Sequence, residues 1–128
     1  MIYLVDTHVL IWLTVQSPRL DQSTQELLAD PDNEIYFSAI SIFEIAVKQQ
    51  LTKVDFNVEA SVIRRVLIEK GYCELAVNGL HASFVGTMPL IHKDPFDRLL
   101  VAQANVEGMT LITADEQVAQ YPGPILKI

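Results

Sequence analysis

Cysteine is nearly absent from the sequence, and long hydrophobic runs are missing altogether. Because Cys73 is the only cysteine among 128 residues, no disulfide can form within the chain, which favours a reducing, cytoplasmic setting. This cysteine lies in the apolar stretch 72–77, so we expect a buried, inert thiol. No apolar run approaches the length of about eighteen residues that a membrane span needs. The first residues lack basic side chains and their apolar run stops at Asp6, so we expect no secretion signal.

Basic side chains are also scarce. The chain has 9 lysines and arginines against 16 aspartates and glutamates, which gives a net charge of −7. Such a chain is not a typical nucleic-acid binder, because neutralising phosphates normally requires a basic face. Carboxylates that bind cations would nevertheless be neutralised once loaded, and a basic partner protein would have the same effect. The acidity therefore argues against nucleic-acid binding without excluding it.

Short apolar runs alternate with segments of helical spacing, and no linker, repeat or low-complexity segment interrupts them. We expect strands at 2–5, 35–37, 74–77, 109–112 and 124–128. We expect helices at 8–15, 21–29, 42–51, 60–69, 80–85, 95–106 and 115–119. This alternation predicts one α/β domain over residues 1–128, with three α/β/α layers around a parallel sheet of about four or five strands.

Several acidic residues are predicted to lie at one end of this sheet. Asp6 ends the first strand, and Asp115 follows a later strand. Glu44 lies in the first turns of the helix after the second strand, and Asp97 lies in the first turn of the helix 95–106. In open parallel sheets the active crevice lies outside the carboxyl ends of the strands. We therefore expect these four carboxylates to share that edge.

Each acid also fits a simpler role as a helix cap. Ser41 and Glu44 fit a capping box, and residues 113–116 fit the same pattern. Asp94 is followed by proline, as expected of an N-cap, which leaves Asp97 in the first turn. Helix dipoles favour acids at these positions in any protein. Taken one at a time, the acids are better explained as caps.

Taken together, the acids indicate a cation site. Asp6 and Glu44 have apolar sequence neighbours on both sides, where an unpaired carboxylate is costly. Several converging carboxylates would also repel one another and raise their pKa values. A divalent cation removes both problems. An all-carboxylate site suits Mg²⁺ or Mn²⁺ rather than zinc, and the chain lacks a cysteine–histidine set with ligand spacing.

Four segments of the chain, in this order and over almost its whole length, resemble the PIN domain. They are similar above all to the PIN-domain toxins of VapBC-type toxin–antitoxin systems. The segments are Val5-Asp6-Thr7-His8, Ser38–Lys48 with Ser41 and Glu44, His92–Leu100 with Asp94 and Asp97, and Leu111–Asp115.

This resemblance implies a PIN-like fold and a metal-dependent endoribonuclease that uses Mg²⁺ or Mn²⁺ to activate water against RNA. The catalytic and metal-binding acids would be Asp6, Glu44, Asp97 and Asp115. Supporting roles near the site fall to Thr7, Ser41, Asp94, Arg98 and Glu116. The family also implies a toxin that forms a homodimer and binds a cognate antitoxin protein.

Basic side chains near the acids could contact the phosphates of RNA. The candidates for RNA contact are Lys48, Lys53, Lys93 and Arg98. His8 and His92 lie beside the predicted site, but a structural hydrogen bond or a solvated ring is favoured over acid–base catalysis for each. A parallel sheet with both faces buried leaves no open aromatic platform for stacking bases.

Two other classes of protein remain as alternatives. One is a PIN-like module that acts only by binding partners, with its acids kept as caps; the presence of all four acids argues against it. The other is a magnesium-binding receiver domain or a haloacid-dehalogenase-type phosphatase. A receiver domain needs an acidic pair ending the first strand and an aspartate ending a central strand, but here the first strand ends in Asp6 alone and the middle strands offer no such aspartate. The phosphatase needs Asp-x-Asp after its first strand, and Asp6-Thr7-His8 lacks the second acid.

Overall fold

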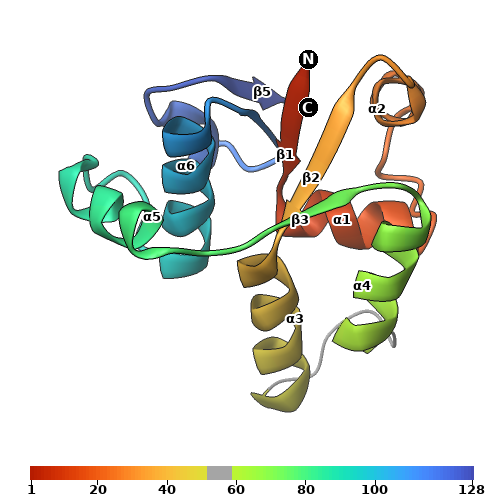
Figure 1. The fold of residues 1–128 in the computed structure, drawn as a ribbon, viewed down its shortest axis with the longest axis horizontal. Helices are drawn as coiled ribbons and strands as arrows, with labels where there is room; N and C mark the ends of the chain where they lie inside the picture. The colour runs from red at the N-terminus through yellow and green to blue at the C-terminus, as the bar shows by residue number, and fades with distance from the viewer. Residues whose placement is uncertain (52–58) are drawn as a thin grey trace.

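A five-stranded parallel sheet forms the centre of the molecule (Figure 1). The computed structural model describes residues 1–51 and 59–128. The strands lie in the order β3-β2-β1-β4-β5, and each neighbouring pair is parallel. Their bounds are β1 (Ile2–Val5), β2 (Glu34–Ser38), β3 (Cys73–Leu75), β4 (Thr110–Thr113) and β5 (Ile125–Lys127). Because β1 lies in the middle, the residue after it stands at the centre of the carboxyl edge of the sheet.

Helices cover both faces of the sheet, which confirms the predicted α/β/α layers. They are α1 (Thr7–Thr14), α2 (Gln22–Ala29), α3 (Ala39–Leu51), α4 (Ala60–Glu69), α5 (Gly79–Phe84) and α6 (Pro95–Glu107), with short 3₁₀ turns η1 (Val85–Thr87) and η2 (Val118–Gln120). Side chains alternate along β1, so Tyr3 and Val5 pack with residues of α1, α2 and α4, whereas Leu4 packs with residues of α6. Each face of the strand thus has its own hydrophobic core.

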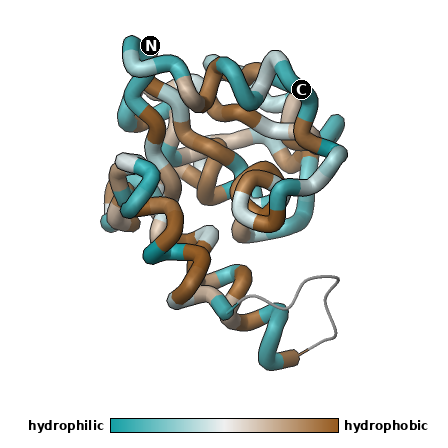
Figure 2. Tube along the Cα trace, turned by 90° about the vertical axis from the view of Figure 1, so that its right-hand side faces the viewer, coloured by the Kyte–Doolittle hydropathy of each residue, from teal (hydrophilic) through white to brown (hydrophobic). Residues whose placement is uncertain are grey.

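The helices α3 and α4 extend together beyond the carboxyl edge of the sheet as an arm, seen at the bottom of Figure 1. Figure 2 shows the same arm from the side, with hydrophobic segments along its length. Three of its large apolar side chains are exposed: Phe43 (56 %), Leu51 (75 %) and Ile68 (44 %). The arm therefore offers apolar surface outside the two cores.

Some predicted boundaries and roles were wrong. Helix α3 begins at Ala39, three residues before the predicted start, because the Ser38 hydroxyl accepts a hydrogen bond from the N–H of Ile40 as the chain leaves β2. Glu44 consequently lies beyond the first turn, and the predicted capping box with Ser41 is absent. Residues 115–119 form no α-helix; a 3₁₀ turn at Val118–Gln120 takes its place.

Cys73 is exposed, contrary to the expectation of a buried thiol. It lies on β3, which is the edge strand of the sheet, so one side of the strand has no neighbouring strand to cover it. Within the described part of the chain, no helix has the length and apolarity required to cross a bilayer.

Candidate active site

The candidate site is assembled at the carboxyl edge of the sheet, where β1 and β2 lead into α1 and α3 and where α6 begins (Figure 1). Asp6 follows β1, Glu44 lies on α3, and Asp97 lies in the first turn of α6. The charge of Glu44 raises the pKa values of Asp6 and Asp97, and the charge of Asp6 raises that of Asp97, so the three carboxylates lie near each other. All three are buried, with exposed fractions of 3 %, 2 % and 9 % for the whole residue, backbone included.

Asp6 is held by the neighbouring strand rather than by its own helix. It occupies the N-cap position of α1, yet its side chain makes no capping hydrogen bond. Instead, Oδ2 accepts a hydrogen bond of 2.6 Å from the Thr113 hydroxyl at the end of β4, while Oδ1 is buried with no partner among the described residues. Burial raises the pKa of Asp6, and the charge of Glu44 adds to this effect, whereas the bond from Thr113 opposes it.

Glu44 is paired within its own helix. Its Oε2 accepts a hydrogen bond from the ammonium group of Lys48, one turn further along α3. Its Oε1 is buried and has no partner within the described residues. Burial of the Lys48 amine works to lower its pKa, but the bond to Glu44 and the charges of Asp94 and Asp97 together raise it. Lys48 is therefore engaged with the carboxylates.

Asp97 has the most strongly perturbed carboxyl group of the site. Burial, followed by the charges of Asp6 and Asp94, raises its pKa from 3.8 to about 6. Its Oδ2 lies 2.9 Å from Nε2 of His92, and this hydrogen bond opposes the rise. A carboxyl group this easily protonated is typical of a functional site rather than of a helix cap.

One pattern is common to the three buried carboxylates. One oxygen of each is held by a side chain of the protein: the donors are Thr113, Lys48 and His92. The other oxygens of Asp6 and Glu44 are buried and lack partners in the described chain. Buried acceptors without partners cost about 1–3 kcal/mol each, and charged ones more. A divalent cation bound between the carboxylates would satisfy these oxygens and offset the repulsion, so the residues fit such an ion.

The family model of the PIN domain matches residues 3–124, which include all of these positions. This chain belongs to the PIN domain family. It is 29 % identical over 129 residues to Ribonuclease VapC22 of Mycobacterium tuberculosis, a match that spans 94 % of this chain and 92 % of that protein.

The fold of this PIN domain is also similar to solved structures. One is VapBC2 from Rickettsia felis bound to a DNA fragment from their promoter, with 20 % identity, a TM-score of 0.75 and coverage of 99 % of this chain and 98 % of that one. Another is the DNA-bound VapBC of Salmonella typhimurium, with 16 % identity, a TM-score of 0.68 and the same coverage. At these identities the likeness shows the fold.

Asp115 stands at the margin of the PIN-domain site. Its Oδ1 accepts hydrogen bonds from the N–H groups of Gln117 and Val118, so it caps the turn that leads into η2. Its own N–H donates to the hydroxyl of Thr113, the same hydroxyl that donates to Asp6. Thr113 thus links Asp115 to the buried carboxylates. Glu116 is exposed.

The residues given supporting roles have mainly structural contacts. Asp94 caps α6 as predicted, since its Oδ1 accepts hydrogen bonds from the N–H groups of Phe96 and Asp97. The hydroxyl of Thr7 donates to that of Ser41 at 2.8 Å, and both residues are buried. This bond joins the start of α1 to α3 beside the carboxylates.

Arg98 is not available for RNA contact, contrary to the prediction. Arg98 is only 8 % exposed, and its guanidinium donates to the carbonyls of Pro89 and Val85 and to the Tyr121 hydroxyl. It therefore fastens the segment before α6 to the core. Of the other basic candidates, Lys48 pairs with Glu44, Lys93 is exposed, and Lys53 lies outside the described residues.

Replacing Arg98 with alanine is expected to lower the free energy of unfolding by about 3 kcal/mol, because the buried acceptors lose their donors and a void opens around them. Denaturant unfolding measures this loss. Arg65→Ala is the matched control: Arg65 is exposed on α4, and its one ion pair with a described residue is a long one of 4.0 Å to Glu69, so its loss should change stability by about 0.5 kcal/mol or less. Equal effects of the two substitutions would contradict a structural role for Arg98.

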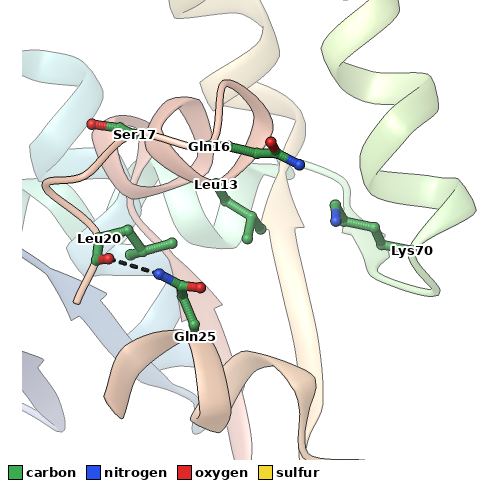
Figure 3. A pocket seen from close by; sticks show the side chains of 6 residues that line it. All are labelled: Leu13, Gln16, Ser17, Leu20, Gln25 and Lys70. Carbon is green, nitrogen blue, oxygen red and sulfur yellow. Dashed lines mark hydrogen bonds between the residues drawn. The ribbon is translucent and has the colours of Figure 1, made fainter. Parts of the chain in front are cut away.

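A recess of about 360 Å³ lies elsewhere on the molecule (Figure 3). Side chains from the end of α1, the following loop, α2 and the segment after α4 surround it, and Gln25 donates a hydrogen bond to the carbonyl of Leu20 at its rim. Its lining residues are Leu13, Gln16, Ser17, Leu20, Gln25 and Lys70. Among the described residues, this lining contains no carboxylate, so the recess is separate from the acidic site at the other end of α1.

Proposed function

We propose that this PIN domain is an endoribonuclease that depends on Mg²⁺ or Mn²⁺ and acts as the toxin of a type II toxin–antitoxin pair. The observation that carries the proposal is the group of three buried carboxylates, two of which have an oxygen that finds no partner in the described part of the chain. Such an arrangement is unfavourable unless a cation completes it. Membership of the PIN family and the similarity to Ribonuclease VapC22 support RNA as the substrate.

Asp6, Glu44 and Asp97 would hold the divalent ion, with Asp115 contributing from the margin. Their oxygens suit Mg²⁺ or Mn²⁺. When bound, the ion would lower the pKa of a water molecule and offset charge on the phosphate. The donors Thr113, Lys48 and His92 would keep one oxygen of each buried carboxylate in place.

RNA cleavage by the isolated protein tests the function. We expect cleavage with Mg²⁺ or Mn²⁺ and none with EDTA, because in the proposed mechanism the bound ion lowers the pKa of the attacking water and offsets charge on the phosphate. The fragments should carry 5′-phosphate and 3′-hydroxyl ends, since water rather than the ribose 2′-hydroxyl attacks. End-labelled RNA and mass spectrometry distinguish the ends. Fragments with 2′,3′-cyclic phosphates, or cleavage that persists in EDTA, would contradict the proposed mechanism.

A protein partner is part of the same proposal. The similar solved structures are those of VapBC proteins, which supports an antitoxin as the partner. The exposed apolar side chains Phe43, Leu51 and Ile68 on the α3–α4 arm offer it a surface, and the net charge of −7 favours a basic protein.

We further propose that the protein is a homodimer. Light scattering of the purified chain measures its mass in solution, and a monomer at micromolar concentration would contradict the dimer.

A further inference from the structure

His92 reaches the site from the loop that precedes α6. Its Nε2 lies 2.9 Å from Oδ2 of Asp97, and both side chains are largely buried, with exposed fractions of 17 % and 12 %. A carboxylate only accepts hydrogen bonds, so Nε2 carries the proton and donates it. The imidazole is thereby hydrogen-bonded to one of the two carboxylate oxygens of Asp97.

The backbone of His92 is anchored by two buried residues. The N–H of His92 donates to the hydroxyl of Tyr121 at 2.8 Å, and that hydroxyl donates back to the carbonyl of His92 at 3.2 Å. Arg98 donates to the same hydroxyl at 3.0 Å. Tyr121 and Arg98 are 4 % and 8 % exposed. The core of the protein therefore determines where the imidazole stands.

We propose that His92 is a positioning residue that holds Oδ2 of Asp97 and thereby leaves Oδ1 for a divalent cation. A carboxylate held at one oxygen cannot rotate to present either oxygen to an ion at random, so the entropy lost on binding is smaller. The role matches that of Thr113 at Asp6, where one oxygen is held and the other meets no partner in residues 1–51 and 59–128. The inference rests on the proposed metal site and not on the cleavage of RNA.

Direct binding of the ion by His92 is the competing arrangement. Ligand atoms of His92, Asp94 and Asp97 lie within 4.8 Å of one another, a spacing that a metal ion can bridge. Two observations favour the positioning role. Nε2 already makes a hydrogen bond to Asp97, and Oδ1 of Asp94 accepts two N–H groups at the start of α6. Each of these bonds engages an atom of the set that could otherwise bind the ion.

Manganese binding by the full chain, followed without RNA, tests the role of His92. Binding is titrated by the electron paramagnetic resonance signal of free Mn²⁺ in the parent, His92→Leu, His92→Asn and His92→Gln proteins. Glutamine places an N–H donor near the position of Nε2, whereas asparagine is too short to do so. We expect His92→Leu and His92→Asn to bind Mn²⁺ about 10- to 100-fold more weakly, and His92→Gln to stay within about threefold of the parent.

His8→Leu is the matched control. His8 is an exposed histidine beside Asp6, and its charged form favours the ionised Asp6. Because solvent screens an exposed charge, its removal should weaken cation binding by no more than about twofold. Circular dichroism checks that each variant is folded. If leucine disrupts the loop, the Mn²⁺ affinities of His92→Gln and His92→Asn still give the comparison.

Three results would overturn the proposal: no Mn²⁺ binding by the parent, parental affinity in both His92→Leu and His92→Asn, or ¹⁴N hyperfine coupling to bound Mn²⁺ that His92→Gln abolishes. The last would identify His92 as a ligand. Because the titration contains no RNA, a protein that needs His92 for Mn²⁺ but cuts no RNA would contradict the proposed function alone.

Discussion

Replacing Asp97 with asparagine is expected to abolish RNA cleavage and, at the same time, to stabilise the metal-free protein. Asparagine has nearly the same shape and its carbonyl still accepts a hydrogen bond from His92, so the fold is retained. Its neutral amide is a poor ligand for a divalent ion, and we expect the cleavage rate to fall by at least about a hundredfold. RNA cleavage at saturating Mn²⁺ measures this loss.

The gain in stability follows from the pKa of Asp97. Burial and the charges of Asp6 and Asp94 raise this pKa from 3.8 to about 6, which at neutral pH corresponds to a penalty of up to about 3 kcal/mol for the ionised side chain. Asparagine removes that penalty. Denaturant unfolding in EDTA at pH 7.5 should therefore show the variant more stable than the parent.

Asp32→Asn provides the matched control for Asp97→Asn, because Asp32 is exposed in the turn before β2, far along the chain from the site. It should leave both cleavage and stability nearly unchanged. If Asp97→Asn cuts RNA at the parental rate, Asp97 does not belong to the active site. If it cuts no RNA but is less stable than the parent in EDTA, the repulsion between the carboxylates has been overstated.

The stability of the metal-free protein is expected to fall as the pH rises from about 4 to about 6. Asp97 and Asp6 both have pKa values above their ordinary value in the folded protein, so the folded state binds more protons than the unfolded state within this window. Stability from these groups is thus fully present at the acidic end, and it is lost as the pH passes the folded pKa. The change for Asp97 is up to about 3 kcal/mol.

Urea unfolding in EDTA at several pH values measures this dependence. Saturating Mn²⁺ should recover stability at pH 7.5, because the ion binds the ionised carboxylates of the folded state. In Asp97→Asn the slope between pH 4 and 6 should become shallower, since one of the two raised groups is gone. A parent protein whose stability rises with pH throughout this window would contradict the assignment, because that is the behaviour of ordinary salt-bridged carboxylates.

Much of the fold was predictable because its signals are local. The apolar runs that became β1 and β4 and the Asp94-Pro95 start of α6 lie within a few residues of the features that identify them. Asp6 could be placed at the sheet edge for the same reason. The start of α3 was missed because Ser38 serves two purposes, ending β2 and accepting the N–H of Ile40.

The environment of each carboxylate could not be predicted, because it depends on tertiary contacts. Arg98 carries a charge and follows an N-cap, which is typical of an exposed residue, yet its partners at Pro89 and Tyr121 bury it. Similarly, a structural hydrogen bond or a solvated ring was expected of His92, and its bond to Asp97 emerges only in the folded chain. The role of Asp115 beside the site remains a prediction, since its observed contacts are those of a turn cap.

The bond between Thr113 and Asp6 joins residues 107 positions apart, and this separation matters during synthesis. β1 pairs with β4, so the whole intervening segment must be synthesised before the two strands can meet. Until then, Oδ2 of Asp6 lacks the Thr113 donor, and the backbone of His92 lacks its anchor at Tyr121. Because contacts between residues far apart in sequence form late in folding, a nascent chain that ends before β4 contains no assembled carboxylate site. The order of the strands thus makes assembly of the site depend on the synthesis of β4.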